Sequence, residues 1–357
     1  KVVDRWFEKF GSSYTFSISI GGYIVDDMGI DVNIMCDRAE LALSKAKKNK
    51  DMHFCIYENY MREQLIQEKE IISYIPTAFE QNQFEIYLQP QYNSETGKII
   101  GAEALTRWHH PKHGMVSPGE FIPIMEENGF ITTMDKYVVE HVCDIINELT
   151  EDMLIDDEFS IAINLSRIDT FNNKIIDWII DTLNRKGVPI HRVRLEITES
   201  AYIEQQAQVS DFVGELKNKG FIIEMDDFGS GYSSLNTLKD VTVDTLKLDL
   251  KFLAGDNTGR GGIIISSVIR MARWMDIPVI AEGVETASQA EYLRSIGCHY
   301  MQGYYFSKPI SVTDFIELLK SNDTTGIARQ KYTESIKDTE NLLDPNNMST
   351  NIFDKIG

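Results

Sequence analysis

The chain of 357 residues is 43% hydrophobic and 25% charged, which excludes a disordered protein, a collagen-like fibre and a short disulfide-stabilised domain. Asp and Glu number 55 against 35 Lys and Arg, so the formal net charge is −20. That balance argues against a general nucleic-acid-binding protein, because phosphate backbones are bound by clustered cations, and we expect no DNA partner. An anionic small substrate is still compatible with it, provided that a bound metal ion supplies positive charge.

Cysteine usage and hydropathy indicate the cellular setting. The cysteines lie far apart with no CxxC pair, which is typical of reduced thiols in the cytosol. No stretch approaches about 18 apolar residues, so we expect no membrane span in this fragment. The first ten residues, KVVDRWFEKF, lack the apolar region of a signal peptide and are typical of the middle of a longer chain. We therefore expect a cytoplasmic location, with any membrane tether of a longer chain outside this fragment.

A separate α+β unit is predicted at the start, over residues 1–58. YTFSISIGGYIV (14–25) is typical of a strand that ends at glycines, and CDRAELALSKAKKNK (36–50) of a helix. MHFCIY (52–57) predicts a closing strand. A helical linker over residues 59–75 then leads into the next domain.

From Phe84 onward, short apolar runs rich in β-branched residues alternate with amphipathic helical segments. Repeated strand–helix units over about 250 residues predict a (β/α)₈ TIM-like barrel over residues 76–320, with a tail or linker at 321–357. A hairpin-like turn at residues 93–97 joins the first two strands, so the first strand should be antiparallel. The eight expected strands are residues 84–90, 99–108, 159–166, 192–199, 221–229, 245–252, 277–285 and 300–307.

Polar residues gather at the carboxyl ends of these strands, where barrels carry their chemistry. They are Glu103, Arg107, Asn164, Glu196, Glu199, Asp226, Asp227, Lys247, Asp249, Glu282, Glu285 and Gln302. One glutamate at a strand end is more often a solvated or salt-bridged surface group. Carboxylates from most of the strands at the same end would instead repel one another, and Mg²⁺ or Mn²⁺ is the natural compensation. The number of such strands favours a metal site.

Four of these positions suggest phosphoester chemistry. The adjacent Asp226 and Asp227 could bridge two metal ions about 3.5–4 Å apart, which suits in-line attack on a phosphodiester. Lys247 adds a mobile positive charge, and Arg107 offers a guanidinium fork for phosphate oxygens.

Several motifs follow one another in an order that resembles a known family. GAEALTRW (101–108), INLS (163–166), LEITES (195–200), DDFGSGYSSL (226–235), LKLD (246–249), AEGVE (281–285) and MQGYYFSKP (301–309) are similar to those of the EAL domain family of cyclic di-GMP phosphodiesterases. The resemblance covers roughly residues 66–320. It implies hydrolysis of cyclic di-GMP to linear pGpG with two Mg²⁺ or Mn²⁺ ions, in bacterial second-messenger signalling.

The resemblance also implies a metal-binding and a catalytic set of residues. Glu103, Asn164, Glu196 and Asp226 match the ligands of one ion, and Asp226, Asp227 and Glu282 those of a second ion, with Asp249 nearby. Lys247 matches the lysine that orients or activates the attacking water, and Gln302 matches a glutamine near that water. The implied catalytic residues are therefore Lys247, Glu282, Glu103 and Gln302.

Further residues are implied to bind substrate or support a loop. Gln89, Leu105, Arg107 and Gln302 match substrate-binding positions, with Arg107 at the phosphate. Glu199 and Glu285 match supporting residues, and Glu199 is expected to anchor the loop at residues 228–235. We expect this loop to couple the metal site to a homodimer contact of the barrel.

Residues 14–57 resemble the C-terminal end of a GGDEF diguanylate cyclase domain, through the SISIGG run, the ALSKAK helix and the final strand. The signature motif of that family is absent, so we expect no cyclase activity from this part of the chain.

Two other functions remain open. One is a non-catalytic receptor that binds cyclic di-GMP and acts through partners, and the other is a barrel hydrolase of a different phosphoester. Degenerate receptors of this kind typically lose metal-binding carboxylates or the lysine, whereas this chain keeps both. The sequence therefore favours catalysis.

Overall fold

The computed structural model describes residues 18–48, 52–172, 174–229, 242–250 and 260–321. The chain divides at Pro76 and Thr77 into two compact units. Among the described residues, no helix is both long enough and apolar enough to cross a membrane.

The first unit is a small α+β structure. Strands β1 (Ile20–Gly22) and β2 (Phe54–Ile56) pair in parallel, and helix α2 (Val32–Lys48) connects them. A Cβ atom on Gly21 would lie 2.2 Å from the backbone nitrogen of Leu43, so the close approach of β1 to α2 requires glycine. The core of this unit is formed by Ala42, Ala46, Cys55, Tyr57 and Met61.

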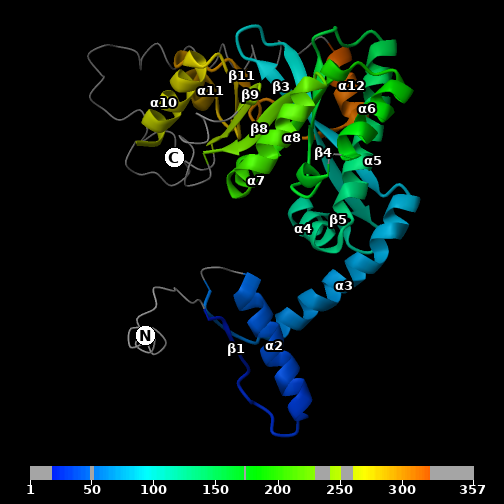
Figure 1. The fold of residues 1–357 in the computed structure, drawn as a ribbon, viewed down its shortest axis with the longest axis vertical. Helices are drawn as coiled ribbons and strands as arrows, with labels where there is room; N and C mark the ends of the chain where they lie inside the picture. Colours follow the sequence, from blue (N-terminus) through cyan, green and yellow to red (C-terminus); the bar gives the residue numbers. More distant parts are fainter. Residues whose placement is uncertain (1–17, 49–51, 173, 230–241, 251–259, 322–357) are drawn as a thin grey trace. The chain divides into compact units, whose positions relative to one another are not determined.

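The second unit is a closed barrel of eight strands (Figure 1). Its ring runs in the order β3, β11, β10, β9, β8, β7, β6 and β4, and closes through β3 and β4. β3 is antiparallel to both of its neighbours in the ring, while the remaining pairs are parallel. The barrel strands are β3 (Phe84–Asn93), β4 (Ile99–His110), β6 (Ser160–Asn164), β7 (Val193–Thr198), β8 (Ile222–Phe228), β9 (Thr245–Asp249), β10 (Val279–Glu282) and β11 (Tyr300–Met301).

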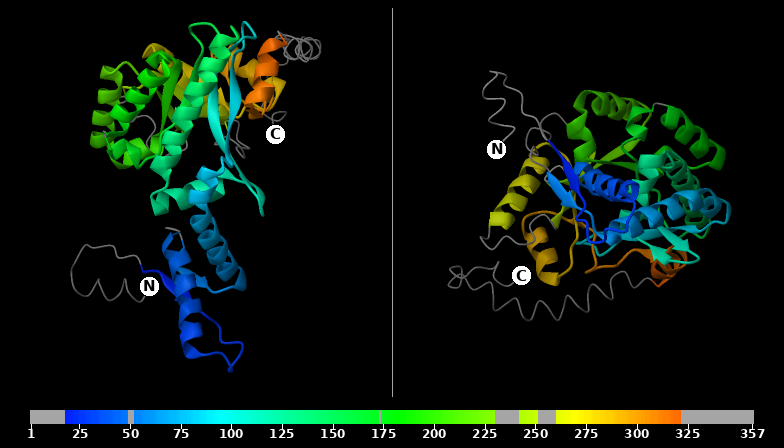
Figure 2. Two further views of the ribbon diagram at one scale, coloured as in Figure 1. Left: turned by 90° about the vertical axis from the view of Figure 1, so that its right-hand side faces the viewer. Right: turned by 90° about the horizontal axis from the view of Figure 1, so that it is seen from below.

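Helices cover the outside of this barrel, as the views in Figures 1 and 2 show. In α5, Val138, Val142 and Ile146 recur every four residues and are buried, because this spacing places them on one helix face. Helix α3 (Asn59–Glu80) spans the boundary between the two units. The helices of the barrel unit are α4 (Pro118–Asn128), α5 (Ile131–Glu151), α6 (Lys174–Lys186), α7 (Glu199–Glu204), α8 (Gln206–Asn218), α10 (Arg260–Trp274), α11 (Ala287–Ser295) and α12 (Val312–Lys320), with short 3₁₀ turns η1 (Asp169–Phe171) and η2 (Ile190–Arg192).

The sequence-based prediction of a (β/α)₈ barrel with an antiparallel first strand is confirmed. Each of the eight expected strands is present, although most are shorter than the apolar runs that predicted them. Two short strands were not expected. β5 (Gly114–Val116) pairs with residues 108–110 at the end of β4, and β12 (Ile310–Ser311) pairs with residues 87–88 in the middle of β3.

Candidate metal centre

Lys247 lies at the centre of a cluster of carboxylates inside the barrel. Its Nζ is 2.8 Å from Glu196 Oε1 and 2.9 Å from Glu282 Oε1. The same atom lies 3.3 Å from Glu103 Oε2 and 3.3 Å from Asp226 Oδ1. Lys247 and Glu196 have no exposed surface, and Glu103 is only 6% exposed. Residues from β4, β7, β8, β9 and β10 therefore meet at one buried point.

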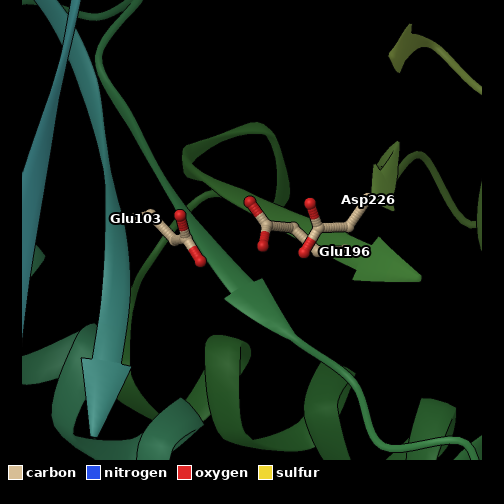
Figure 3. A group of neighbouring side chains, drawn as sticks. All are labelled: Glu103, Glu196 and Asp226. Atoms are coloured by element: carbon tan, nitrogen blue, oxygen red, sulfur yellow. The ribbon is translucent and has the colours of Figure 1, made fainter. Parts of the chain in front are cut away.

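Three of these carboxylates could hold a cation. Each of Glu103, Glu196 and Asp226 offers a carboxylate oxygen within 4.8 Å of those of the other two. Figure 3 shows their carboxyl groups gathered in one place, although they come from three different strands. Carboxylate oxygens are the ligands that Mg²⁺ and Mn²⁺ prefer.

Strand register explains why these residues meet. Side chains alternate along a strand, so residues of the same parity point into the barrel. Glu103 pairs with Ala162 on β6, and Glu196 pairs with Asn164. Lys247 pairs with Ile280, two residues before Glu282. Asn164 and Glu282 end β6 and β10, whereas Glu103, Glu196 and Lys247 lie within their strands, and the register brings all of these residues to the same level of the barrel interior.

Amide side chains hold Glu103 from two sides. Asn164 Nδ2 donates to Glu103 Oε1 at 3.0 Å, and Gln302 Nε2 donates to Glu103 Oε2 at 2.6 Å. Gln302 Nε2 also donates to Gln89 Oε1 at 3.1 Å, and Gln89 Nε2 donates to the carbonyl oxygen of Ser307 at 3.3 Å. The predicted residues Gln89, Asn164 and Gln302 thus join the carboxylate cluster.

Asp226 and Asp227 sit at an irregularity of β8. The β8–β9 register shifts between Met225 and Phe228, and Asp227 has a φ of 56°. The backbone N–H of Asp227 donates to Asp226 Oδ1 at 2.8 Å. A bulge with a left-handed residue re-aims side chains, and such features are over-represented next to active sites. Asp227 is more exposed than Asp226 and is close enough to Asp226 and Asp249 to feel their charges.

Of the remaining predicted residues, Arg107 and Leu105 lie on the same strand as Glu103, whereas Glu285 is exposed. Arg107 is half-buried beside the cluster and feels the charge of Glu103, and its guanidinium lies 5.5 Å from the ring centre of Tyr87. Leu105 and Arg107 share the parity of Glu103 along β4. Glu285 is exposed, and its backbone N–H donates to Gln289 at the start of α11, so the structure does not bring its side chain to the cluster.

Glu199 begins α7 and is fully buried. Its Oε2 accepts a hydrogen bond of 2.9 Å from the backbone N–H of Gly229, directly after β8. This hydrogen bond holds the second residue beyond the aspartate pair. Residues 230–241, which hold the rest of the predicted loop, lie outside the described residues.

Burial and mutual repulsion dominate the electrostatics of the cluster. Burial raises the pKa of Glu196 well above its usual range, and the charge of Glu103 raises it further. Burial likewise raises the pKa of Glu282. Burial lowers the pKa of Lys247, but Glu103 and the other carboxylates outweigh it and hold that pKa well above its ordinary value. Lys247 is therefore an ammonium at neutral pH.

The donor set fits divalent cations. Four carboxyl groups face the single ammonium of Lys247, so the described part of the cluster holds more acidic groups than cationic ones. Neither oxygen of Glu196 receives a hydrogen bond of good geometry from the described residues, although Lys247 Nζ lies 2.8 Å from Oε1. Buried carboxylate oxygens with incomplete partners are costly, and cations would satisfy them.

A layer of polar residues beneath the cluster was not predicted from the sequence. Arg194, Glu224 and Gln91 are all at most 8% exposed, and each lies two residues from a residue of the cluster on the same strand. The signal that could have found them is this i, i+2 spacing, because same-parity residues share the barrel interior.

A buried carboxyl pair lies outside the cluster. Asp135 Oδ2 accepts from the backbone N–H of Ser166 at 2.9 Å, and Asp169 Oδ1 accepts from the hydroxyl of Thr132 at 2.7 Å. Burial, followed by the neighbouring Asp169 carboxyl group, raises the pKa of Asp135 well above its usual range.

A barrel with an antiparallel first strand and a carboxylate cluster at its carboxyl end defines the class of protein. Residues 73–309 match the EAL domain family. This match covers more than half of the chain, so the protein belongs to the EAL domain family.

Curated relatives are similar over most of the chain. An uncharacterized protein of Synechocystis is 33% identical over 292 residues, which are 82% of this chain and 42% of that protein. The bifunctional diguanylate cyclase/cyclic di-GMP phosphodiesterase MucR of Pseudomonas aeruginosa is 30% identical over 82% of this chain and 43% of its own length. The chain thus spans about two fifths of these relatives.

Solved structures show the same fold. The PaMucR phosphodiesterase in complex with c-di-GMP has a TM-score of 0.65 and 30% identity, over 69% of this chain and 99% of that chain. The EAL enzyme Bd1971, in its cAMP- and cyclic-di-GMP-bound form, has a TM-score of 0.67 and 28% identity, over 82% of this chain and 77% of that chain.

Proposed function

We propose that this chain hydrolyses cyclic di-GMP to linear pGpG by a two-metal mechanism. The observation that carries the proposal is the buried cluster of four carboxylates around Lys247, at the carboxyl end of an EAL-family barrel. The proposal is supported by the PaMucR phosphodiesterase, a solved relative in complex with c-di-GMP. Every polar residue expected of the family's site is present in this chain.

Two ligand sets are proposed for two Mg²⁺ or Mn²⁺ ions. Glu103, Asn164, Glu196 and Asp226 would hold one ion, and Asp226, Asp227 and Glu282 would hold the other, with Asp249 nearby. Bound there, the ions would neutralise phosphate charge and acidify a coordinated water. They would also relieve the repulsion among the carboxylates, so that an anionic substrate could approach.

The chain's own residues supply orientation and charge. Because the pKa of Lys247 is raised, its ammonium acts as a hydrogen-bond donor and a positive charge rather than as a base. It would orient the attacking water and stabilise the charge that develops on the phosphate in the transition state. Arg107, Gln89 and Leu105 would bind the substrate, with the Arg107 guanidinium on phosphate oxygens.

The decisive experiment is an assay of the purified chain with cyclic di-GMP and Mg²⁺ or Mn²⁺. Products would be separated by chromatography and identified by mass. Formation of pGpG that stops on chelation supports the proposal. Binding of cyclic di-GMP without turnover would support the receptor alternative, and neither binding nor turnover would point to another phosphoester.

The organisation of the chain is also proposed. We infer that residues 1–58 are the C-terminal end of a GGDEF-like domain, joined by a helical linker (59–75) to the EAL barrel (76–320), with a tail at 321–357. The parallel pair β1–β2 around α2 supports this assignment. We further propose a cytoplasmic location. We also propose a homodimer through the barrel, and light scattering coupled to size-exclusion chromatography would test this oligomeric state.

A further inference from the structure

A continuous chain of buried polar side chains runs beneath the carboxylate cluster. Arg194 donates through one terminal nitrogen to Glu224 Oε1 at 2.5 Å and through the other to Gln91 Oε1. Gln91 Nε2 then donates to Gln302 Oε1 at 2.9 Å, and Gln302 Nε2 donates to Glu103 Oε2 at 2.6 Å. The chain of hydrogen bonds therefore connects the Arg194–Glu224 ion pair to Glu103.

The barrel backbone leaves space for this arrangement. A Cβ atom on Gly101 would lie 2.7 Å from a terminal nitrogen of Arg194 and 3.4 Å from Gln91 Oε1. Gly101 and Gln91 are paired residues of β4 and β3, so the guanidinium fills the volume that a side chain on β4 would occupy. The carbonyl oxygen of Ser160 would lie 2.6 Å from the same Cβ atom, so glycine here accommodates both the neighbouring strand and the guanidinium.

The groups at the two ends fix the donor-to-acceptor direction of these hydrogen bonds, from Arg194 to Glu103. A guanidinium can only donate hydrogen bonds, and a carboxylate can only accept them. Gln91 must therefore turn its oxygen towards Arg194 and its NH₂ group towards Gln302. Gln302 must in turn present its oxygen to Gln91 and its NH₂ group to Glu103 and Gln89, which uses both of its hydrogens.

We propose that Arg194 is a positioning residue, which acts through Gln91 and Gln302 to hold an N–H donor on Glu103. This inference rests on the proposed function, since Glu103 is assigned there as a metal ligand. Without Arg194, the Gln91 amide can reverse and present its oxygen to Gln302. The Gln302 amide can then reverse as well, which turns its Nε2 towards Gln91 and away from Glu103. Outer partners of metal ligands typically contribute about 10–100-fold to metal affinity or activity.

Two variants interrupt this series of hydrogen bonds in different ways. The double variant Arg194→Met/Glu224→Gln removes the guanidinium without leaving a buried carboxylate unpaired, which limits the loss of stability. Gln91→Met removes the first amide and leaves the ion pair intact. The matched control is Glu224→Gln, in which Arg194 loses its ionic partner but still donates to Gln91.

The main measurement is Mn²⁺ binding by calorimetry on the full chain without substrate, and circular dichroism checks folding. We expect Arg194→Met/Glu224→Gln and Gln91→Met to bind Mn²⁺ about 10–100-fold more weakly, with a parallel fall in turnover. Glu224→Gln should stay within about threefold of wild type, below the loss expected for a missing outer partner, because Arg194 still donates to Gln91. If the double variant does not fold, Gln91→Met decides the question alone.

Two results would overturn the inference. One is Mn²⁺ affinity within about threefold of wild type in folded Arg194→Met/Glu224→Gln and Gln91→Met. The other is an equal loss in Glu224→Gln, which would mean that the ion pair matters only for the fold. A wild-type chain that binds no Mn²⁺ would instead refute the proposed function, and the inference with it.

Discussion

Replacing Lys247 with methionine should destabilise the metal-free protein strongly. The side chain of Lys247 is fully buried, and its ammonium faces Glu103, Glu196, Asp226 and Glu282 within 3.3 Å. Methionine keeps an unbranched stem of similar length but removes the charge. The four carboxylates then lose the cation that this part of the structure provides.

The magnitude follows from the burial of the cluster. Removing one partner of a buried ion pair costs about 3–5 kcal/mol, because the other charge is left uncompensated. For a domain of this size, each kcal/mol lowers Tm by about 2–4 °C, so we expect a fall of about 6–20 °C. A divalent cation at 100 times its Kd should raise the stability of the variant by about 2.7 kcal/mol above its value in chelator.

Thermal unfolding in chelator and in Mg²⁺ would measure both effects. The matched control is Lys217→Met, since Lys217 lies 2.8 Å from Asp244 but both side chains are about one third exposed. Partly exposed pairs contribute about 0–1 kcal/mol, so the control should change Tm little in either buffer. Equal Tm values for Lys247→Met and wild type in chelator would show that the carboxylates do not depend on Lys247.

Three further outcomes are expected. Glu103→Gln should abolish hydrolysis and weaken Mn²⁺ binding in a folded protein, whereas Glu85→Gln, at a half-exposed position of β3, should match wild type in both assays. Ca²⁺ should support cyclic di-GMP binding but little turnover, because it holds oxygens at about 2.3–2.6 Å against about 2.0–2.1 Å for Mg²⁺; calorimetry and product assays in each ion would show this, and equal turnover would contradict it. Because the pKa of Asp135 is raised, the folded protein keeps a proton that the unfolded chain releases above about pH 3.9. The free energy of unfolding should therefore fall as pH rises from about 3.9 towards the pKa of the folded state, by up to about 1.4 kcal/mol per pH unit. In denaturant titrations Asp135→Asn should lose less stability over the same range, and parallel curves would refute this.

The strand–helix alternation and the polar strand ends could be read from the sequence, because both depend on local periodicity. Apolar runs of four to eight residues predict strands, and each run that ends in a polar residue predicts its position at the carboxyl end. Glu103, Glu196, Asp226 and Lys247 were identified in this way, and the closed barrel places them together.

Other features depend on closure of the ring and on backbone geometry. Gln91 and Gln302 are 211 residues apart in the chain, and they meet only because β3 and β11 become neighbours when the barrel closes. The bulge that separates the directions of Asp226 and Asp227 follows from the register between β8 and β9. No local pattern specifies such a register, since it depends on how both strands pack against the rest of the barrel.

The clearest difference between sequence and structure concerns Arg194 and Glu224. In the sequence each is a charged residue within an apolar strand, which local rules would assign to the surface. In the structure they pair inside the barrel, where a buried charge is tolerated only with a partner and hydrogen bonds. The sequence by itself determined which polar residues lie in the strands of the barrel, whereas the tertiary structure decided which of the buried charges compensate one another.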